Sequence, residues 1–208
     1  MKAFIFDLDG VLVSTDKYHY QAWKKMADDE GIYFDEKIND RLRGVSRMAS
    51  LGIILERAGR QYTEEEKVAL ATKKNDLYRD LLKNLTPADR LAGVTETLEK
   101  LRAEGFLLAV GSSSKNTPTI LDKIGYGGDF DAVSDGNNIT KSKPDPEVFV
   151  KAAEMLKLPA EECFVVEDAK AGIDAAKAGG FVSVGIGDAA DYDKTDYKIS
   201  TISDILKL

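Results

Sequence analysis

Two aspartates separated by one residue follow a short apolar run near the start of the chain. Residues 3–6 are apolar, and Asp7-Leu8-Asp9-Gly10 comes directly after them. The run predicts a buried strand, and on an ideal strand Asp7 and Asp9 would share a face. A carboxylate can attack phosphorus, and a second one can exchange protons with the leaving and attacking oxygens. The pair therefore predicts phosphoryl transfer, with Asp7 as nucleophile and Asp9 as general acid and base, and Gly10 permits a sharp exit from the strand.

Other reactive side chains lie at the ends of further apolar runs or in a loop before one. They are Ser112 and Ser114 after residues 107–110, Lys143 before residues 164–166, and Glu167 and Asp168 after that run. Ligands of open α/β sheets sit beyond the carboxyl ends of the strands, so we expect these groups to converge. Crowded carboxylates need a cation, and their oxygens favour magnesium. Ser112 and Lys143 would supply the hydrogen bonds and positive charge that a transferring phosphoryl group requires.

Each motif has a simpler interpretation when it is taken alone. Asp-x-Asp-Gly is common in turns and calcium loops, although residues 11–18 lack the further spaced acids of a calcium loop. Ser112 alone would be a turn or N-cap serine, and Glu167-Asp168 alone would be acids at a helix N-terminus. Their joint occurrence at the ends of predicted strands favours the catalytic interpretation.

The elements that must position these groups alternate between strands and helices. Further strands are predicted at residues 130–133 and 181–186, and helices at residues 94–103, 115–124, 146–156 and 171–178. This alternation predicts an α/β fold with a Rossmann-like, mostly parallel sheet covered by helices on both faces.

Residues 15–86 differ from the rest because they show helical periodicity and no strand pattern. Helices are expected at residues 18–30, 46–60 and 63–85, and Thr63-Glu64-Glu65-Glu66 resembles a capping box that opens the last one. We therefore predict a core domain of residues 1–14 and 87–208, with a small all-helical cap domain inserted at residues 15–86.

Composition narrows the class of protein. The 208 residues carry a net charge of −7, which argues against nucleic acid or an anionic membrane as a partner. Cys163, the single cysteine, lies in an apolar run and is expected to be a buried thiol in a reducing compartment. No segment is long enough for a secretory signal or a membrane span. We expect a cytoplasmic monomer that acts on a small molecule.

The reactive residues resemble the four motifs of the haloacid dehalogenase superfamily. The matching segments are Phe6–Val11, Ser112, Lys143-Pro144 and Glu167-Asp168. The resemblance covers the whole chain and implies a magnesium-dependent enzyme with that fold. It implies that Asp7 forms an aspartyl-phosphate, and that Asp9 is the acid–base with its backbone carbonyl on the metal. Asp7, Glu167 and Asp168 would be the other metal ligands.

Additional residues resemble the β-phosphoglucomutase branch of that superfamily. Those implied in the site are Thr15, His19, Trp23, Arg43, Gly44, Val45, Arg47, Ser50, Lys74, Ser114, Lys115 and Asn116. The resemblance implies an isomerase that interconverts β-D-glucose 1-phosphate and D-glucose 6-phosphate, with β-glucose 1,6-bisphosphate as intermediate and activator. A mutase must hold a second phosphate, and Arg47, supported by Lys115 and Asn116, can grip it.

Several alternatives remain open at this point. His19 can be a structural histidine or a hinge residue that engages Asp9, Trp23 can be core or sugar pocket, and the arginines can be solvated. Lys74 is favoured over Lys73 because it lies beside Asn75. At the level of function, a sugar-phosphate phosphatase and a non-enzymatic sugar-phosphate binding protein are the competing hypotheses.

The chain departs from the branch at a few positions. Arg43 stands where lysine is frequent, and Ser113 stands where alanine is frequent. Lys143-Pro144-Asp145-Pro146 has the acidic form found in related phosphatases. None of these changes removes a group that the chemistry needs, but they leave the sugar preference open.

Overall fold

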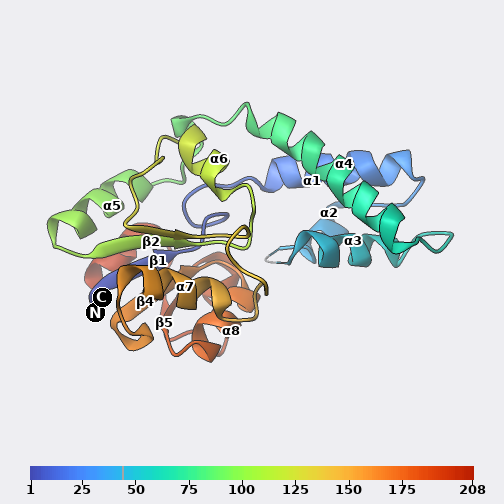
Figure 1. Cartoon of the computed structure of the whole chain (residues 1–208). Coiled ribbons are helices and arrows are strands. Elements are labelled where there is room, and N and C mark those ends of the chain that lie inside the picture. The colour runs from blue at the N-terminus through green and yellow to red at the C-terminus, as the bar shows by residue number, and fades with distance from the viewer. Residues whose placement is uncertain (44) are drawn as a thin grey trace. The chain divides into compact units, whose positions relative to one another are not determined.

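The computed structural model describes residues 1–43 and 45–208, so Gly44, a predicted site residue, lies outside the described residues. The chain divides into two compact units. The larger unit contains Met1–Ser14 and Thr86–Leu208, and the helical unit contains Thr15–Leu85 (Figure 1).

The larger unit is built on a parallel sheet of six strands in the order β3-β2-β1-β4-β5-β6. The strands are β1 Ala3–Phe6, β2 Leu107–Gly111, β3 Ala132–Ser134, β4 Cys163–Glu167, β5 Val182–Gly185 and β6 Tyr197–Lys198. The predicted α/β class with a parallel sheet is confirmed. β1 is central and every one of its residues is buried, which explains why its sequence is apolar without alternation.

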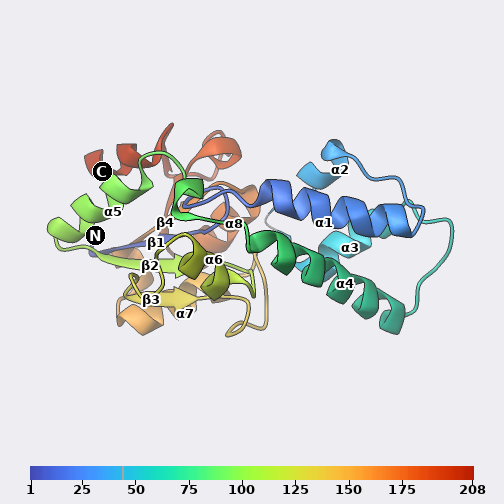
Figure 2. The same cartoon turned by 90° about the horizontal axis from the view of Figure 1, so that it is seen from above.

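Helices cover both faces of this sheet (Figures 1 and 2). α5 (Val94–Ala103) and α6 (Thr117–Lys123) lie on one face, and α7 (Glu147–Leu156) and α8 (Lys170–Ala178) lie on the other. The core beneath α7 and α8 includes Ile5, Val165 and Phe149. Four short 3-10 helices complete the unit: η1 Pro87–Asp89, η2 Ala160–Glu162, η3 Gly187–Ala189 and η4 Ile202–Lys207.

The helical unit consists of α1 (Asp16–Asp29), α2 (Glu36–Asp40), α3 (Arg47–Leu55) and α4 (Glu64–Leu82). Trp23, Met26, Leu51, Ile54 and Leu70 are buried in its own core.

The predicted capping box is confirmed at the start of α4. Thr63 Oγ1 accepts from the Glu66 N–H at 3.2 Å, and Glu66 Oε2 accepts from the Thr63 N–H at 2.8 Å. Across the described ranges 1–43 and 45–208, no helix is long and apolar enough to cross a membrane.

Candidate active site

Asp7 lies directly beyond the end of β1, at the middle of the sheet. Its backbone N–H donates to the Val166 carbonyl at 2.9 Å, so the β1–β4 ladder fixes its position. The chain then turns back, because the N–H groups of Leu12 and Val13 both donate to the Leu8 carbonyl. β1 ends at Phe6, so Asp9 lies in this turn and the expectation that Asp7 and Asp9 share a strand face is wrong.

Two glycines leave room for the carboxylates at this edge. Gly10 lies in the turn after β1 and has a φ of +92°, a conformation that favours glycine. A Cβ at Gly10 would lie 2.0 Å from Asp168 Oδ2, and a Cβ at Gly172 would lie 2.0 Å from Glu167 Oε1. A side chain at either position would therefore displace an acidic group of the site.

Lys143 joins the carboxylates into one buried network. Its Nζ donates to Asp7 Oδ1 at 2.5 Å and also to Glu167 Oε1. The second oxygen of Glu167 accepts from the Ala169 N–H at 3.1 Å. Only 3% of the Lys143 side chain and 1% of the Glu167 side chain are exposed. The loop that carries Lys143 and the ends of β1 and β4 thus meet in one place, as the sequence predicted for Asp7, Lys143 and Glu167.

The positive charge of Lys143 does not balance the negative charges of the carboxylates around it. Burial, together with the charges on Glu167, Asp7 and Asp9, raises the pKa of Asp168 to about 8. Burial also raises the pKa of Glu167 to about 7, although the Lys143 ammonium opposes the rise. Burial alone would lower the pKa of Lys143, but the charges on Asp7 and Glu167 raise it above its usual value. The site holds more negative charge than Lys143 neutralises, so it attracts a further cation.

The carboxylates fit a divalent metal ion. One oxygen each from Asp7, Glu167 and Asp168 lies within 4.8 Å of the other two. Carboxylate oxygens are the ligands that magnesium prefers, and it usually completes its shell with water and substrate oxygens. The backbone carbonyl predicted for Asp9 would add a fourth protein ligand.

The loop after β2 lies beside Asp7, because Phe6 of β1 pairs with Val110 of β2. In this loop, the Ser112 hydroxyl accepts from the Ser114 N–H at 3.3 Å, and the Ser114 hydroxyl accepts from the Asn116 N–H at 3.2 Å. Ser112 and Asn116 are buried and Lys115 is exposed. Ser112, Ser114, Lys115 and Asn116 thus form a hydrogen-bonded turn in which Lys115 is the charged residue.

The helical unit holds a second group of predicted residues, gathered around His19. Lys74 Nζ lies 2.8 Å from His19 Nδ1 and 4.7 Å from the centre of the Trp23 ring. Tyr78 stacks on His19 with ring centres 4.0 Å apart, and its hydroxyl donates to Thr15 Oγ1 at 2.9 Å. The sequence prediction missed Tyr78, although its spacing of four residues from Lys74 places both on one face of α4.

This arrangement fixes the protonation of His19. A lysine ammonium only donates, so Nδ1 accepts and the ring proton is on Nε2. Burial and the charges on Lys74 and Arg47 hold the pKa of His19 well below 6.5. His19 is therefore a neutral imidazole with an Nε2–H donor.

The other predicted residues of the helical unit are near the start of α3. Ser46 caps this helix, and the partly buried Arg47 follows it, with a pKa that burial lowers. Ser50 is buried and Val45 is partly buried. Arg43 pairs instead with Asp16, at 2.9 Å, and more distantly with Asp40. The structure thus directs the Arg43 guanidinium toward carboxylates of its own unit.

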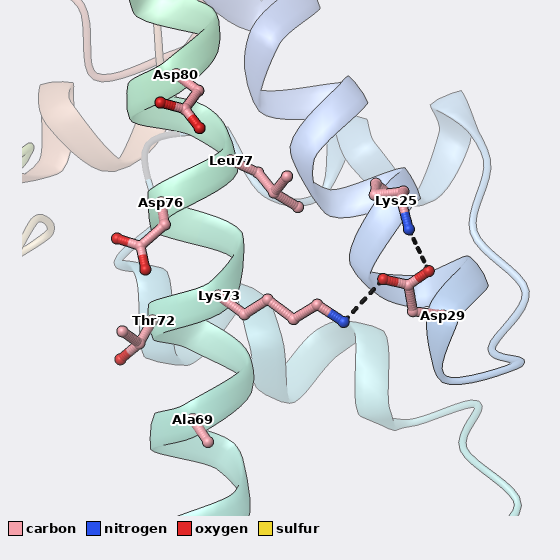
Figure 3. A pocket seen from close by; sticks show the side chains of 8 residues that line it. All are labelled: Lys25, Asp29, Ala69, Thr72, Lys73, Asp76, Leu77 and Asp80. Atoms are coloured by element: carbon pink, nitrogen blue, oxygen red, sulfur yellow. Dashed lines mark hydrogen bonds and ion pairs between the residues drawn. The ribbon is translucent and has the colours of Figure 1, made fainter.

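A groove of about 550 Å³ runs between α1 and α4 and is lined by charged and uncharged residues of both helices. Figure 3 shows Lys25 and Lys73 converging on Asp29, and Lys73 Nζ lies 2.8 Å from that carboxylate. Lys73 is exposed in this ion pair, whereas Lys74 is buried beside His19. None of the predicted site residues lines the groove.

Comparison with known proteins decides the family. A family model described as haloacid dehalogenase-like hydrolase matches residues 1–180. The chain belongs to this family. It is similar to a β-phosphoglucomutase of Bacillus subtilis (strain 168), with 42% identity over 99% of this chain and 92% of the relative. It is also similar to a phosphorylated carbohydrates phosphatase of Thermotoga maritima, with 31% identity over 86% of this chain and 82% of the relative.

A solved structure agrees with this placement in the haloacid dehalogenase-like family. The crystal structure of a β-phosphoglucomutase from Clostridium difficile superposes with a TM-score of 0.92 and 37% identity, covering 99% of this chain and 93% of that one. The chain is therefore an enzyme homologue within the family and has its fold.

We predict that Mg²⁺ stabilises the folded chain through the carboxylates. At a free concentration of 100 times its Kd, a ligand that binds only the folded state adds about 2.7 kcal/mol. Differential scanning fluorimetry should show a rise in Tm with Mg²⁺ that Asp168→Asn largely abolishes. Asp28→Asn, which changes an exposed carboxylate paired with Lys24, should keep the full rise. An undiminished rise in Asp168→Asn would contradict the assignment.

We predict that the single histidine stays neutral in the folded protein at pH values where a free imidazole is protonated. Because its folded pKa lies well below 6.5, the unfolded chain binds the proton first, and stability is lost as the pH falls below 6.5. Nitrogen-15 NMR should report the Nε2–H tautomer, and Lys74→Met should raise the pKa. A His19 that titrates near 6.5 in the unmodified chain would contradict this assignment.

Proposed function

We propose that this chain is a β-phosphoglucomutase that interconverts β-D-glucose 1-phosphate and D-glucose 6-phosphate through β-glucose 1,6-bisphosphate. The observation that carries the proposal is the buried Asp7–Lys143–Glu167 network at the end of β1. The 42% identity to a β-phosphoglucomutase over nearly the whole chain supports this substrate. Action as a cytoplasmic monomer on a small sugar phosphate is part of the same proposal.

Asp7 is the proposed nucleophile. The Asp7 carboxylate attacks phosphorus of the bisphosphate, forms an aspartyl-phosphate, and the bond to the sugar oxygen breaks. Lys143 donates to one Asp7 oxygen and leaves the other for the attack. Mg²⁺ held by Asp7, Glu167, Asp168 and the Asp9 carbonyl would neutralise charge on the phosphoryl oxygens.

Asp9 is the proposed acid and base. It gives a proton to the sugar oxygen that leaves, and in the next half-reaction it takes a proton from the sugar hydroxyl that attacks the aspartyl-phosphate. Asp9 follows Asp7 in the turn after β1, and its charge contributes to the raised pKa of Asp168, which supports a position near the cluster. The engagement of Asp9 by Thr15 and His19 is a prediction of the resemblance.

A mutase also needs a second binding site, for the phosphate group that is not being transferred. Arg47 is the proposed group, because it is partly buried at the start of α3. Burial lowers the pKa of Arg47, and the charge of Asp76 opposes this effect. A guanidinium binds phosphate oxygens in pairs, and the helix N-terminus adds positive potential. Lys115 and Asn116 are the proposed supporting residues.

The second candidate function is a sugar-phosphate phosphatase on the same scaffold. The likeness to a phosphorylated carbohydrates phosphatase supports it, and both reactions share the step at Asp7. They differ in whether water or a sugar hydroxyl attacks the aspartyl-phosphate.

A product assay separates the two functions. We expect β-glucose 1-phosphate, supplied with Mg²⁺ and a trace of bisphosphate, to yield D-glucose 6-phosphate as the main product. Enzyme-coupled detection of glucose 6-phosphate and of inorganic phosphate measures both outcomes in one sample. Release of inorganic phosphate as the main product would contradict the mutase assignment.

Arg47→Ala serves as the internal comparison for that assay. Loss of a charged phosphate contact should reduce mutase flux by tenfold or more, at about 1.5–3 kcal/mol for such a hydrogen bond, with a smaller effect on cleavage of a small aryl phosphate. Arg41→Ala removes an exposed arginine of the same unit, which pairs with Glu56, and should leave both rates unchanged. Equal losses on both substrates in Arg47→Ala would contradict a role at the second phosphate.

A further inference from the structure

The loop that carries Lys143 is anchored to the first turn of α7. Glu147, the first residue of α7, accepts three hydrogen bonds at its Oε2 atom. The donors are the N–H and the hydroxyl of Thr140, each at 2.9 Å, and the N–H of Lys141 at 2.7 Å. One carboxylate oxygen therefore fixes two consecutive residues of the loop shortly before Lys143.

A lysine one turn further along α7 holds this carboxylate in place. Lys151 Nζ pairs with Glu147 Oε1 at 3.0 Å, and it also donates to the Asn138 carbonyl, upstream in the same loop. The hydrogen bond from the Lys141 N–H, followed by the one from Lys151, lowers the pKa of Glu147 to about 2. Glu147 is therefore a carboxylate at neutral pH, and its hydrogen bonds to the loop are strengthened by its charge.

The first turn of α7 also contacts the ammonium end of Lys143. Lys143 Nζ lies 4.7 Å from the centre of the buried Phe149 ring, within the range of a cation–π interaction. The ring is closely packed, because a Cβ at Gly111, the last residue of β2, would lie 2.6 Å from it. Glu147 thus fixes the backbone that leads to Lys143, and Phe149 lies beside its ammonium.

A lysine depends strongly on such anchoring. Its stem has several rotatable bonds, so the ammonium has a defined position only when the backbone beneath it is fixed. Lys143 is two residues beyond Lys141, and two residues span at most about 7 Å. A loop that is fixed at Lys141 therefore keeps Lys143 close to Asp7 and Glu167, the two carboxylates that its Nζ contacts.

We propose that Glu147 is a positioning residue of the phosphoryl-transfer site, which acts through Lys143 by fixing the loop that carries it. The inference rests on the proposed function for the role of Lys143 at the transferring phosphate. Without the Glu147 carboxylate, the loop separates from α7 more often, and the Lys143 ammonium then leaves Asp7 and Glu167. The reaction at Asp7 slows because its charge partner is displaced.

Glu147→Ala tests the proposal through the accessibility of Lys143. The full chain is treated briefly with acetic anhydride, and peptide mass spectrometry compares acetylation of Lys143 with that of Lys100, an exposed lysine of α5. The ratio should rise about tenfold in the variant, because local opening exposes the buried ammonium. The kcat of the product assay should fall about tenfold to a hundredfold. Glu147→Gln, which keeps one oxygen acceptor for the loop, should give intermediate values.

Asp204→Ala is the matched control, because Asp204 makes the same kind of contacts elsewhere. Its Oδ2 accepts from the N–H and the hydroxyl of Thr201, each at 3.0 Å, and Lys207 Nζ donates to its Oδ1 at 2.6 Å. Asp204 lies in η4, which packs on α5 and leads to the C-terminus, near the N-terminus (Figure 1). The control should lower the Tm as Glu147→Ala does, and leave the acetylation ratio and kcat unchanged.

The outcomes separate this inference from the proposed function. An unchanged acetylation ratio or an unchanged kcat in Glu147→Ala, or changes equal to those of Asp204→Ala, overturn the role of Glu147 even if the protein is a mutase. If the unmodified protein releases phosphate as its main product, the mutase function fails, and the acetylation ratio with the rate of phosphate release still tests Glu147.

Circular dichroism shows whether each variant is folded. If Glu147→Ala does not fold, Glu147→Gln is compared with Asp204→Asn. A higher acetylation ratio and a lower kcat in Glu147→Gln alone support the proposal, and equal values in the two variants overturn it.

Discussion

The site depends on the contact of the Lys143 ammonium with Asp7 and Glu167 in the interior of the larger unit. A buried charge is costly unless it is paired, so neither the lysine nor the two carboxylates could occupy this position alone. The pairing is incomplete, because Asp168 adds a further carboxyl group whose pKa burial and its acidic neighbours raise to about 8. This residual negative charge suits the site to a divalent cation and, with it, to a phosphate.

Three features of the fold bring these charges together: the register of the parallel strands, two glycines, and the burial of β1. Parallel strands bring Asp7 and Glu167 to one edge, since Phe6 pairs with Val166 in register. Gly10 and Gly172 give the carboxylates the space that any side chain would fill. The helices on both faces bury β1 completely, and this burial removes water from the base of the site. The same apolar packing thus forms the core and strengthens the charge interactions at its edge.

The sequence could predict what depends on local pattern. The fully buried strands have unbroken apolar runs, the reactive residues follow directly after them, and Thr63 with Glu66 shows the capping box. It could not predict α2, with Ile38 as its buried residue, or β6, which has two residues, because such short elements have no period. Individual contacts between distant residues were less accessible. The strand ends predicted that Asp7 and Lys143, 136 residues apart, would converge, but not the hydrogen bond between them. The hydrogen bond from Tyr78 of α4 to Thr15 was not predicted.

The central claim is that Asp7 itself carries the phosphate, and covalent labelling tests it most directly. The protein is incubated with Mg²⁺ and β-glucose 1,6-bisphosphate, quenched in acid, digested and sequenced by tandem mass spectrometry. The account predicts a phosphoryl group on Asp7 of the wild-type chain and none in Asp7→Asn, which should also be inactive. Full turnover by Asp7→Asn, or a phosphoryl group on another residue that persists in that variant, would contradict it.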